Sequence, residues 1–97
     1  MATKNKEERL VVILTEFKEI FCGWVTDVSG DRIQLRNARQ ACYYSEATHG
    51  LIGLAVTGPA KGSRIGPAAN IEVRRVVNVI ECQSAAVEAW ENAKWAA

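Results

Sequence analysis

The stretch Arg32-Ile33-Gln34-Leu35-Arg36 carries the clearest structural signal in this sequence. Apolar and polar residues alternate, so Ile33 and Leu35 face one side of an extended chain while the polar side chains face the other. This alternation predicts a half-buried β-strand. An Asp-Val-Ser-Gly-Asp turn at 27–31 precedes it, and residues 37–45 are expected to continue in extended form.

Short apolar runs on both sides of this stretch predict further strands. They lie at 10–14, 20–25, 50–56 (thinned by glycine) and 71–80. About five strands with tight turns favour a mainly-β fold, either a small curved antiparallel sheet or an SH3-like or Sm-like barrel, with one C-terminal α-helix.

The C-terminal helix is expected over about 84–95, with Ser84 as its N-cap. Apolar residues at three- and four-residue spacing form a stripe on it: Ala86, Val87, Trp90 and Ala93. Trp90 can cover the end of the barrel from this stripe. Trp95 is harder to bury within one chain, so it predicts a contact between copies in a homo-oligomer.

Length and composition describe one globular domain. The chain has 97 residues, 48% apolar and 24% charged, with a net charge of +1. We expect a charged N-terminal arm at 1–9 and a single domain at 10–97. The composition excludes a disordered chain and a uniformly basic nucleic-acid binder. The longest charge-free run, 47–60, is too short to span a membrane, and the charged N-terminus does not look like a signal peptide.

The cysteines and the charge pattern refine this description. Cys22, Cys42 and Cys82 are widely spaced with no CxxC pair, which predicts reduced, mostly buried thiols in a cytoplasmic protein. Between positions 32 and 75 there are seven basic and two acidic residues, a balance of +5, whereas the remaining residues carry −4. A basic middle can create a positive face on the fold, although scattered solvated charge explains the same numbers.

A Gly/Pro-rich loop at 57–67 is the strongest candidate for a binding site. It combines hydroxyls, cations and glycines: Thr57, Gly58, Lys61, Gly62, Ser63 and Arg64. Glycine allows backbone N–H groups to approach an anion closely, and Lys or Arg supplies charge, so the loop predicts a phosphate site. It has no Walker A spacing. A long structural turn with solvated charges accounts for the same residues at least as well.

A second candidate lies on the strand before this loop. Arginines close to tyrosines can grip a phosphate and stack a base. At period 2, Arg36 would share a face with Tyr44, and Arg39 would share the opposite face with Tyr43. Ordinary half-buried packing of the tyrosines is the alternative.

Catalytic and metal-binding patterns are poor. The single histidine, His49, lies at a turn, and no nucleophile–histidine pairing or carboxylate pair is visible. One histidine and three scattered cysteines do not make a zinc site. We therefore expect a protein that is not an enzyme and has no metal or cofactor.

The order of short motifs resembles a small family of uncharacterised proteins of tailed bacteriophages and prophages. The motifs are Phe21-Cys22-Gly23-Trp24, Leu35-Arg36-Asn37-Ala38-Arg39, Tyr43-Tyr44-Ser45, Gly53-Leu54-Ala55-Val56-Thr57-Gly58-Pro59, Ser63-Arg64-Ile65-Gly66-Pro67-Ala68, Val79-Ile80-Glu81-Cys82 and Ala89-Trp90-Glu91. The resemblance covers about residues 10–91, and Gln83-Ser84 departs from a Thr-Pro pair. It implies a phage-encoded domain of unknown function in the host cytoplasm, and it supplies no catalytic residues.

These observations favour a non-catalytic, oligomeric binding protein that sequesters a phosphorylated or nucleotide-type small molecule, for instance a signal of host immunity. Two alternatives stay open. One is an Sm-like nucleic-acid binder that uses Arg36, Arg39, Arg74 and Arg75 as a phosphate track. The other is a protein–protein module that inhibits a host factor. No membrane partner is expected.

Overall fold

The computed structural model describes residues 8–95 and contains six strands and three helical segments. The strands are β1 (Arg9–Thr15), β2 (Ile20–Val25), β3 (Arg32–Tyr43), β4 (Arg64–Ile65), β5 (Ala69–Arg74) and β6 (Val76–Glu81). The helical segments are η2 (Glu46–Thr48, a 3-10 turn), α1 (Gly50–Val56) and α2 (Ser84–Asn92). Of the predicted arm at 1–9, only Glu8 and Arg9 belong to the described residues. None of the helices between residues 8 and 95 is long and apolar enough to cross a membrane.

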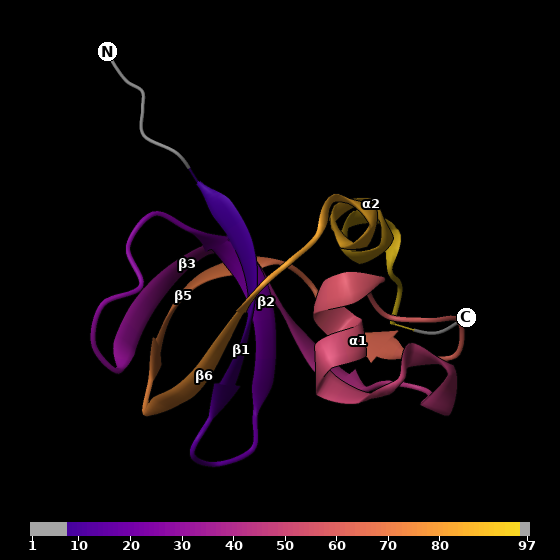
Figure 1. Ribbon diagram of the computed structural model, residues 1–97, viewed down its shortest axis with the longest axis horizontal. Coiled ribbons are helices and arrows are strands. Elements are labelled where there is room, and N and C mark those ends of the chain that lie inside the picture. The colour runs from indigo at the N-terminus through magenta and orange to yellow at the C-terminus, as the bar shows by residue number, and fades with distance from the viewer. Residues whose placement is uncertain (1–7, 96–97) are drawn as a thin grey trace.

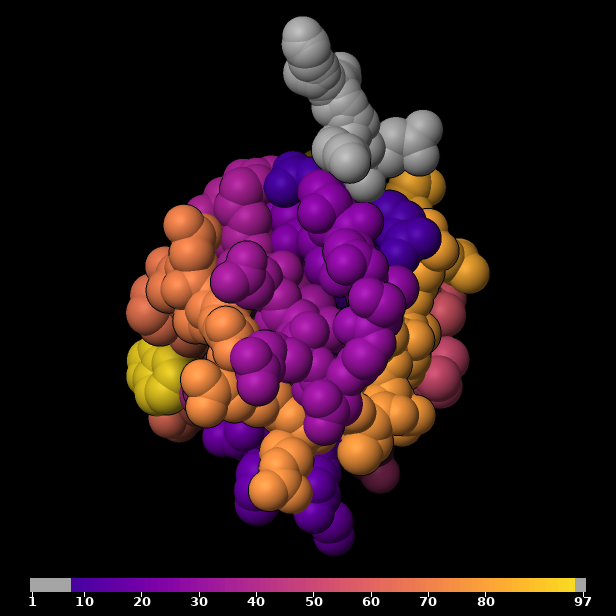
Figure 2. Space-filling model, turned by 90° about the vertical axis from the view of Figure 1, so that its left-hand side faces the viewer, coloured from indigo at the N-terminus to yellow at the C-terminus, as the bar shows by residue number. Residues whose placement is uncertain are grey.

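All strand pairs are antiparallel and form one open, curved sheet in the order β4-β3-β2-β1-β6, with β5 also paired to β3. The helices lie together at one end of the sheet (Figure 1). At the other end, the purple β2–β3 segment lies between the orange strands β5 and β6 (Figure 2). The prediction of a mainly-β, curved antiparallel sheet with a C-terminal helix is confirmed.

The sheet buries apolar side chains on both of its faces. The inner core, inside the curl, contains Val11, Ile13, Val25, Ile33, Leu35, Ala38 and Val73. The helix-side core, on the other face, contains Leu10, Val12, Cys22, Ala41, Leu54, Ala55, Ile65, Ala86 and Trp90. Successive side chains of a strand alternate between faces, so β1 serves both cores, which explains the unbroken apolar run at 10–14 within it.

A bulge in β3 overturns the predicted facing of its arginines. Arg36 pairs with Trp24 of β2, and Arg39 pairs with Cys22, so three steps along β3 match two steps along β2. Asn37 takes up the extra residue with a φ of 52°. Arg36 and Arg39 therefore lie on the same face of the sheet, because Trp24 and Cys22 do.

The predicted strand at 50–56 is instead the helix α1. Periodicity does not separate a short buried helix from a buried strand when the run is apolar and rich in glycine. Leu54 and Ala55 are buried against α2, and the indole N–H of Trp90 donates to Leu54 O at 2.9 Å. Packing on the sheet stabilises this seven-residue helix, which is too short to be stable alone.

The predicted strand at 71–80 is two strands. Arg75, at φ 61°, separates β5 from β6, and the two strands pair with β3 and β1 respectively. Since a regular strand does not contain a left-handed residue, the chain turns a corner there. The helix α2 also differs slightly from its prediction: Gln83, not Ser84, is the N-cap, and the helix ends at Asn92. Its apolar stripe packs as expected, with Ala86 and Trp90 buried.

Candidate functional site

The Gly/Pro loop starts as the end of α1. The backbone N–H groups of Thr57 and Gly58 both donate to Gly53 O, at 2.9 and 3.2 Å, and the Thr57 hydroxyl donates to the same oxygen. Gly58 has a φ of +83°, and a Cβ there would lie 2.5 Å from the Cβ of Ala89 in α2. The Gly58 N–H that the sequence assigned to an anion is therefore used by the helix end, and this glycine is needed for packing.

The middle of the loop is a tight turn. Ser63 N–H donates to Ala60 O at 3.1 Å across Lys61 and Gly62, and Gly62 has the positive φ, +95°, that a type II turn requires. The Ser63 hydroxyl is buried and accepts the N–H of Ser45, so it holds the turn against the end of β3. The N–H groups of Lys61 and Gly62 have no hydrogen-bond partner among residues 8–95 and lie at the exposed tip.

A cavity of about 230 Å³ separates this turn from the end of α2. Lys61 lines it from the loop, and Asn92 and Lys94 line it from the helix end. Its lining contains no carboxylate. Neither lysine forms an ion pair with a described residue, so both ammonium groups are available to an anion.

An exposed aromatic and cationic group, here called the Tyr43–Arg64–Trp95 cluster, involves the same loop. Tyr43 pairs with Arg64 in the β3–β4 register, and the Arg64 guanidinium lies 6.0 Å from the centre of the Trp95 ring. Tyr43 and Trp95 are 55% and 53% exposed. The structure thus brings Tyr43 to the loop, whereas Tyr44 packs partly buried against the helix-side core.

Sequence reasoning missed Asn92 and Lys94, and it assigned Trp95 only to a subunit contact. These residues follow the apolar stripe of α2 and carry no motif of their own. Their position beside the loop arises because Ile65 N–H donates to Lys94 O at 3.2 Å, a contact between segments far apart in sequence.

Arg39 connects the strand, the loop and the helix. Its Nε donates to Gly66 O at 2.7 Å, its Nη1 to Trp90 O at 2.8 Å and its Nη2 to Ile65 O at 3.4 Å. Trp90 O lies in the last turn of α2, where a cation also complements the helix dipole. Arg39 therefore has a structural role that the sequence did not predict. It also lines a second cavity, of about 310 Å³, with Trp24 and Trp90.

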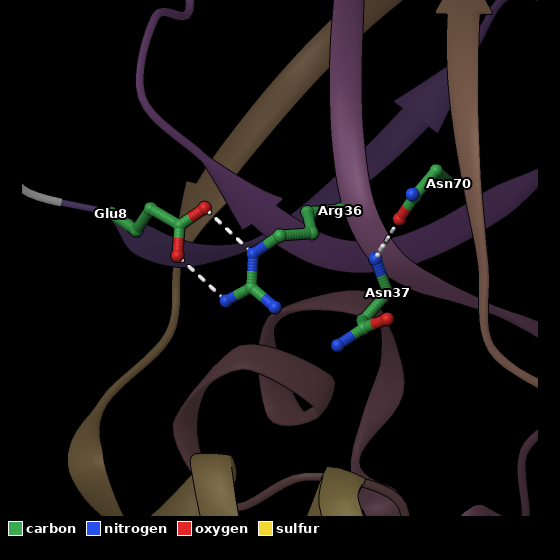
Figure 3. Close-up of polar contacts among 4 residues, drawn as sticks. All are labelled: Glu8, Arg36, Asn37 and Asn70. Carbon is green, nitrogen blue, oxygen red and sulfur yellow. Dashed lines mark hydrogen bonds and ion pairs between the residues drawn. The ribbon is translucent and has the colours of Figure 1, made fainter.

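Arg36 lies on the other side of Trp24, in an open groove of about 470 Å³. Its Nε and Nη2 bind the Glu8 carboxylate in a bidentate pair, at 2.8 and 2.6 Å (Figure 3), and its guanidinium lies 5.9 Å from the centre of the Trp24 ring. The hydrogen bond from Arg36, assisted by its charge and opposed by partial desolvation, lowers the pKa of Glu8. The predicted binding residues thus divide between two separate regions, the loop and the surroundings of Trp24.

Side chains suited to metal binding do not converge among residues 8–95. No cluster of three or more His, Cys, Asp or Glu side chains suited to a metal ion occurs within the described part of the chain. His49 is exposed between η2 and α1. The three cysteines are free thiols: Cys22 is buried, with its Sγ 4.0 Å from that of Cys82, and burial raises the pKa of Cys22. Cys42 is exposed, so the expectation that the thiols are mostly buried is wrong for this cysteine.

These features define a small mainly-β domain with unpaired cations on a loop and a tryptophan between two arginines. Over residues 8–90 the chain matches the family described as a domain of unknown function (DUF6948), and it belongs to that family. No curated protein and no solved structure matches the chain.

Proposed function

We propose that this protein is a non-catalytic binding protein for a phosphorylated small molecule of nucleotide type, which it holds at the Gly/Pro loop. The observation that carries the proposal is the cavity between the loop and the end of α2. Two lysines, Lys61 and Lys94, line it without any carboxylate residue. A phosphate is the common metabolite group that matches such a site, since it accepts charge-assisted hydrogen bonds from several donors at once.

The surroundings of the cavity support a nucleotide rather than a bare phosphate. The Tyr43–Arg64–Trp95 cluster offers two exposed aromatic rings and a third cation beside the loop. Aromatic rings of this kind stack on bases, at roughly 1–3 kcal/mol per base. The free N–H groups of Lys61 and Gly62 add neutral donors at the tip of the turn.

The Sm-like nucleic-acid alternative has less support. A phosphate track needs available cations, but Arg36 pairs with Glu8, Arg74 pairs with Glu72 and Arg75 pairs with Glu16. Arg39 donates to three carbonyl oxygens. An SH3-like or Sm-like relationship stays part of the proposal, supported by the curved antiparallel sheet. A protein–protein module that inhibits a host factor has no comparable site to support it.

The biological setting is proposed from the family resemblance. A phage-encoded protein in the host cytoplasm that sequesters a nucleotide signal of host immunity needs affinity and no catalysis, which suits a site lined by hydrogen-bond donors without a carboxylate, histidine or cysteine. Homo-oligomer formation through Trp95, which is 53% exposed, belongs to the same proposal.

A thermal-shift screen of the intact protein tests the function. The probes are nucleoside mono-, di- and triphosphates, cyclic oligonucleotides and short RNAs, because a ligand that binds the native state raises the melting temperature by mass action. We expect a nucleotide to raise it and Lys61→Gln/Lys94→Gln to weaken that binding roughly ten- to a hundredfold. The matched control is Arg32→Gln/Arg74→Gln. It also removes two positive charges, but from the two arginines that pair with Glu72, away from the loop.

Two results would contradict the proposal. One is an unchanged melting temperature with every nucleotide. The other is equal weakening by the loop pair and the control pair, which would mean that net charge and not the cavity determines binding. Preference for RNA over mononucleotides, lost in the Arg32→Gln/Arg74→Gln control, would instead favour the nucleic-acid alternative.

A further inference from the structure

A second cavity lies between the sheet and α2 and is here called the tryptophan cavity. It is separate from the proposed phosphate site at the Gly/Pro loop, here called the anion site, and plays no part in the proposed function. Its volume is about 310 Å³, and its apolar walls are Leu10, Cys22, Trp24 and Trp90. Three polar side chains also line it: Asn37, Arg39 and Glu91. An apolar pocket with a few convergent polar groups is the usual form of a small-molecule site, and this volume lies at the small end of the range for such sites.

Arg39 lines this cavity and has N–H groups beyond those that its structural bonds use. A guanidinium has five N–H groups, and the bonds to Gly66 O, Trp90 O and Ile65 O use one from each nitrogen. One N–H on Nη1 and one on Nη2 therefore have no acceptor among the described residues. The three bonds fix the plane of the guanidinium. A ligand that accepts hydrogen bonds from the remaining N–H groups therefore costs the Arg39 side chain little further conformational entropy.

Asn37 is held in a special backbone conformation at the rim of the same cavity. Its φ is 52°, and its backbone N–H donates to Asn70 Oδ1 at 3.0 Å. Its side-chain amide makes no hydrogen bond with another described residue, and it points away from Asn70 (Figure 3). Bulges and left-handed non-glycine residues concentrate at binding sites, where they direct a side chain toward a ligand.

We propose that the tryptophan cavity binds a planar heteroaromatic base of purine or pyrimidine type. The ring would lie against Trp24, and the fork of Arg39 and the amide of Asn37 would bind its polar edge. Arg and Asn side chains recognise base edges in this way because each offers two hydrogen-bonding atoms in one plane. The volume suits one base or nucleoside rather than a dinucleotide. A base carries no phosphate, so this site is independent of the cavity lined by Lys61 and Lys94 and of the proposed function.

Intrinsic fluorescence of the full chain tests the proposal. A Trp95→Phe background leaves Trp24 and Trp90, both at the cavity, as the only indoles. The probes are adenosine, guanosine and cytidine, with toluene as a planar ring that lacks the base's polar edge and does not emit in the tryptophan range. We expect at least one nucleoside to quench the fluorescence saturably, and to do so at lower concentrations than those at which toluene changes it. The same titration of the Lys61→Gln/Lys94→Gln variant should be unchanged, which separates this site from the anion site.

Two substitutions assign the binding to this cavity. Asn37→Gly keeps the positive φ and the backbone N–H but removes the amide, and we expect it to weaken nucleoside binding about tenfold. Lys18→Gly is its matched control, because Lys18 also has a positive φ, 67°, but lies in the β1–β2 turn far from the cavity along β2. Ala68→Phe, at an exposed position on the cavity lining, should block entry without disturbing the core.

Each remaining outcome overturns the proposal. If no nucleoside changes the fluorescence, the cavity is not a base site. If toluene binds as tightly as the nucleosides, the cavity is merely apolar and Arg39 and Asn37 recognise nothing. If both Asn37→Gly and Ala68→Phe bind like the parent while remaining folded by circular dichroism, the quenching ligand lies elsewhere.

Discussion

The cations of the sheet and those of the loop differ in their partners. On the sheet, Arg32, Arg36, Arg74 and Arg75 each pair with a glutamate. Around the loop, Lys61, Arg64 and Lys94 form no ion pair with a described residue. Both groups come mainly from the basic middle of the chain. In the first group, Glu8 and Glu16 of the acidic N-terminal part pair with Arg36 and Arg75, and Glu72 of the middle pairs with both Arg32 and Arg74. A basic stretch of sequence therefore becomes a positive surface only where the fold brings no acid to it.

Gly58→Ala should have the largest effect on stability. It would disturb the packing of the loop on α2, which positions the loop cations of this comparison. The new Cβ would meet Ala89 Cβ at 2.5 Å and the residue would keep a φ of +83°. Steric overlap and left-handed strain together should cost about 2–5 kcal/mol in the free energy of unfolding, measured with urea.

Gly62→Ala is the control for that measurement. Gly62 also has a positive φ, but its nearest neighbour for a Cβ is Ser45 at 3.7 Å, an ordinary contact. Only the backbone strain remains, about 1–2 kcal/mol. Equal losses for the two variants would mean that the packing of Gly58 on α2 contributes nothing to stability.

Residues with a strong local pattern were predicted well. The alternation at 32–36 and the stripe of α2 each reflect one periodicity and one buried face, whereas the apolar runs that became β1 and β2 reflect strands buried on both faces. The helix α1 could not be predicted from its own seven residues, because apolar and glycine residues alone carry no period and its packing on α2 decides its conformation.

The candidate site was predictable only where its residues are close in sequence. Lys61, Arg64 and their turn could be recognised together, whereas Lys94 reaches the cavity through a contact between the loop and the helix end. The shared face of Arg36 and Arg39 was not predictable by period 2, since a single extra residue at Asn37 reverses the facing of everything after it.

Arg39→Met should have an intermediate effect and would sharpen the comparison among the arginines. The variant keeps an apolar stem but leaves the carbonyls of Gly66 and Trp90 without their charged donor. We expect a loss of about 1–3 kcal/mol in urea unfolding. Arg36→Met removes an exposed ion pair and should lose clearly less. A larger loss for Arg36→Met than for Arg39→Met would reverse our assignment of the structural arginine.

Glu8→Gln should have the smallest effect, and its sign depends on pH. The Arg36 hydrogen bond lowers the pKa of Glu8 in the folded protein from its ordinary value of 4.5. The folded state therefore prefers the charged carboxylate, and the pair stabilises the protein fully above about pH 4.5 and loses this contribution as the pH falls through the folded pKa. Urea unfolding should show the parent slightly more stable than Glu8→Gln at pH 7 and nearly equal to it at low pH.

Salt at pH 7 should reduce the difference in stability between the parent and Glu8→Gln, because the Glu8–Arg36 pair is exposed. Glu88→Gln, at an exposed position of α2 outside the ion pairs of the described residues, should show neither dependence. A difference between parent and Glu8→Gln that persists unchanged at low pH would mean that Glu8 stabilises the fold by something other than its charge on Arg36.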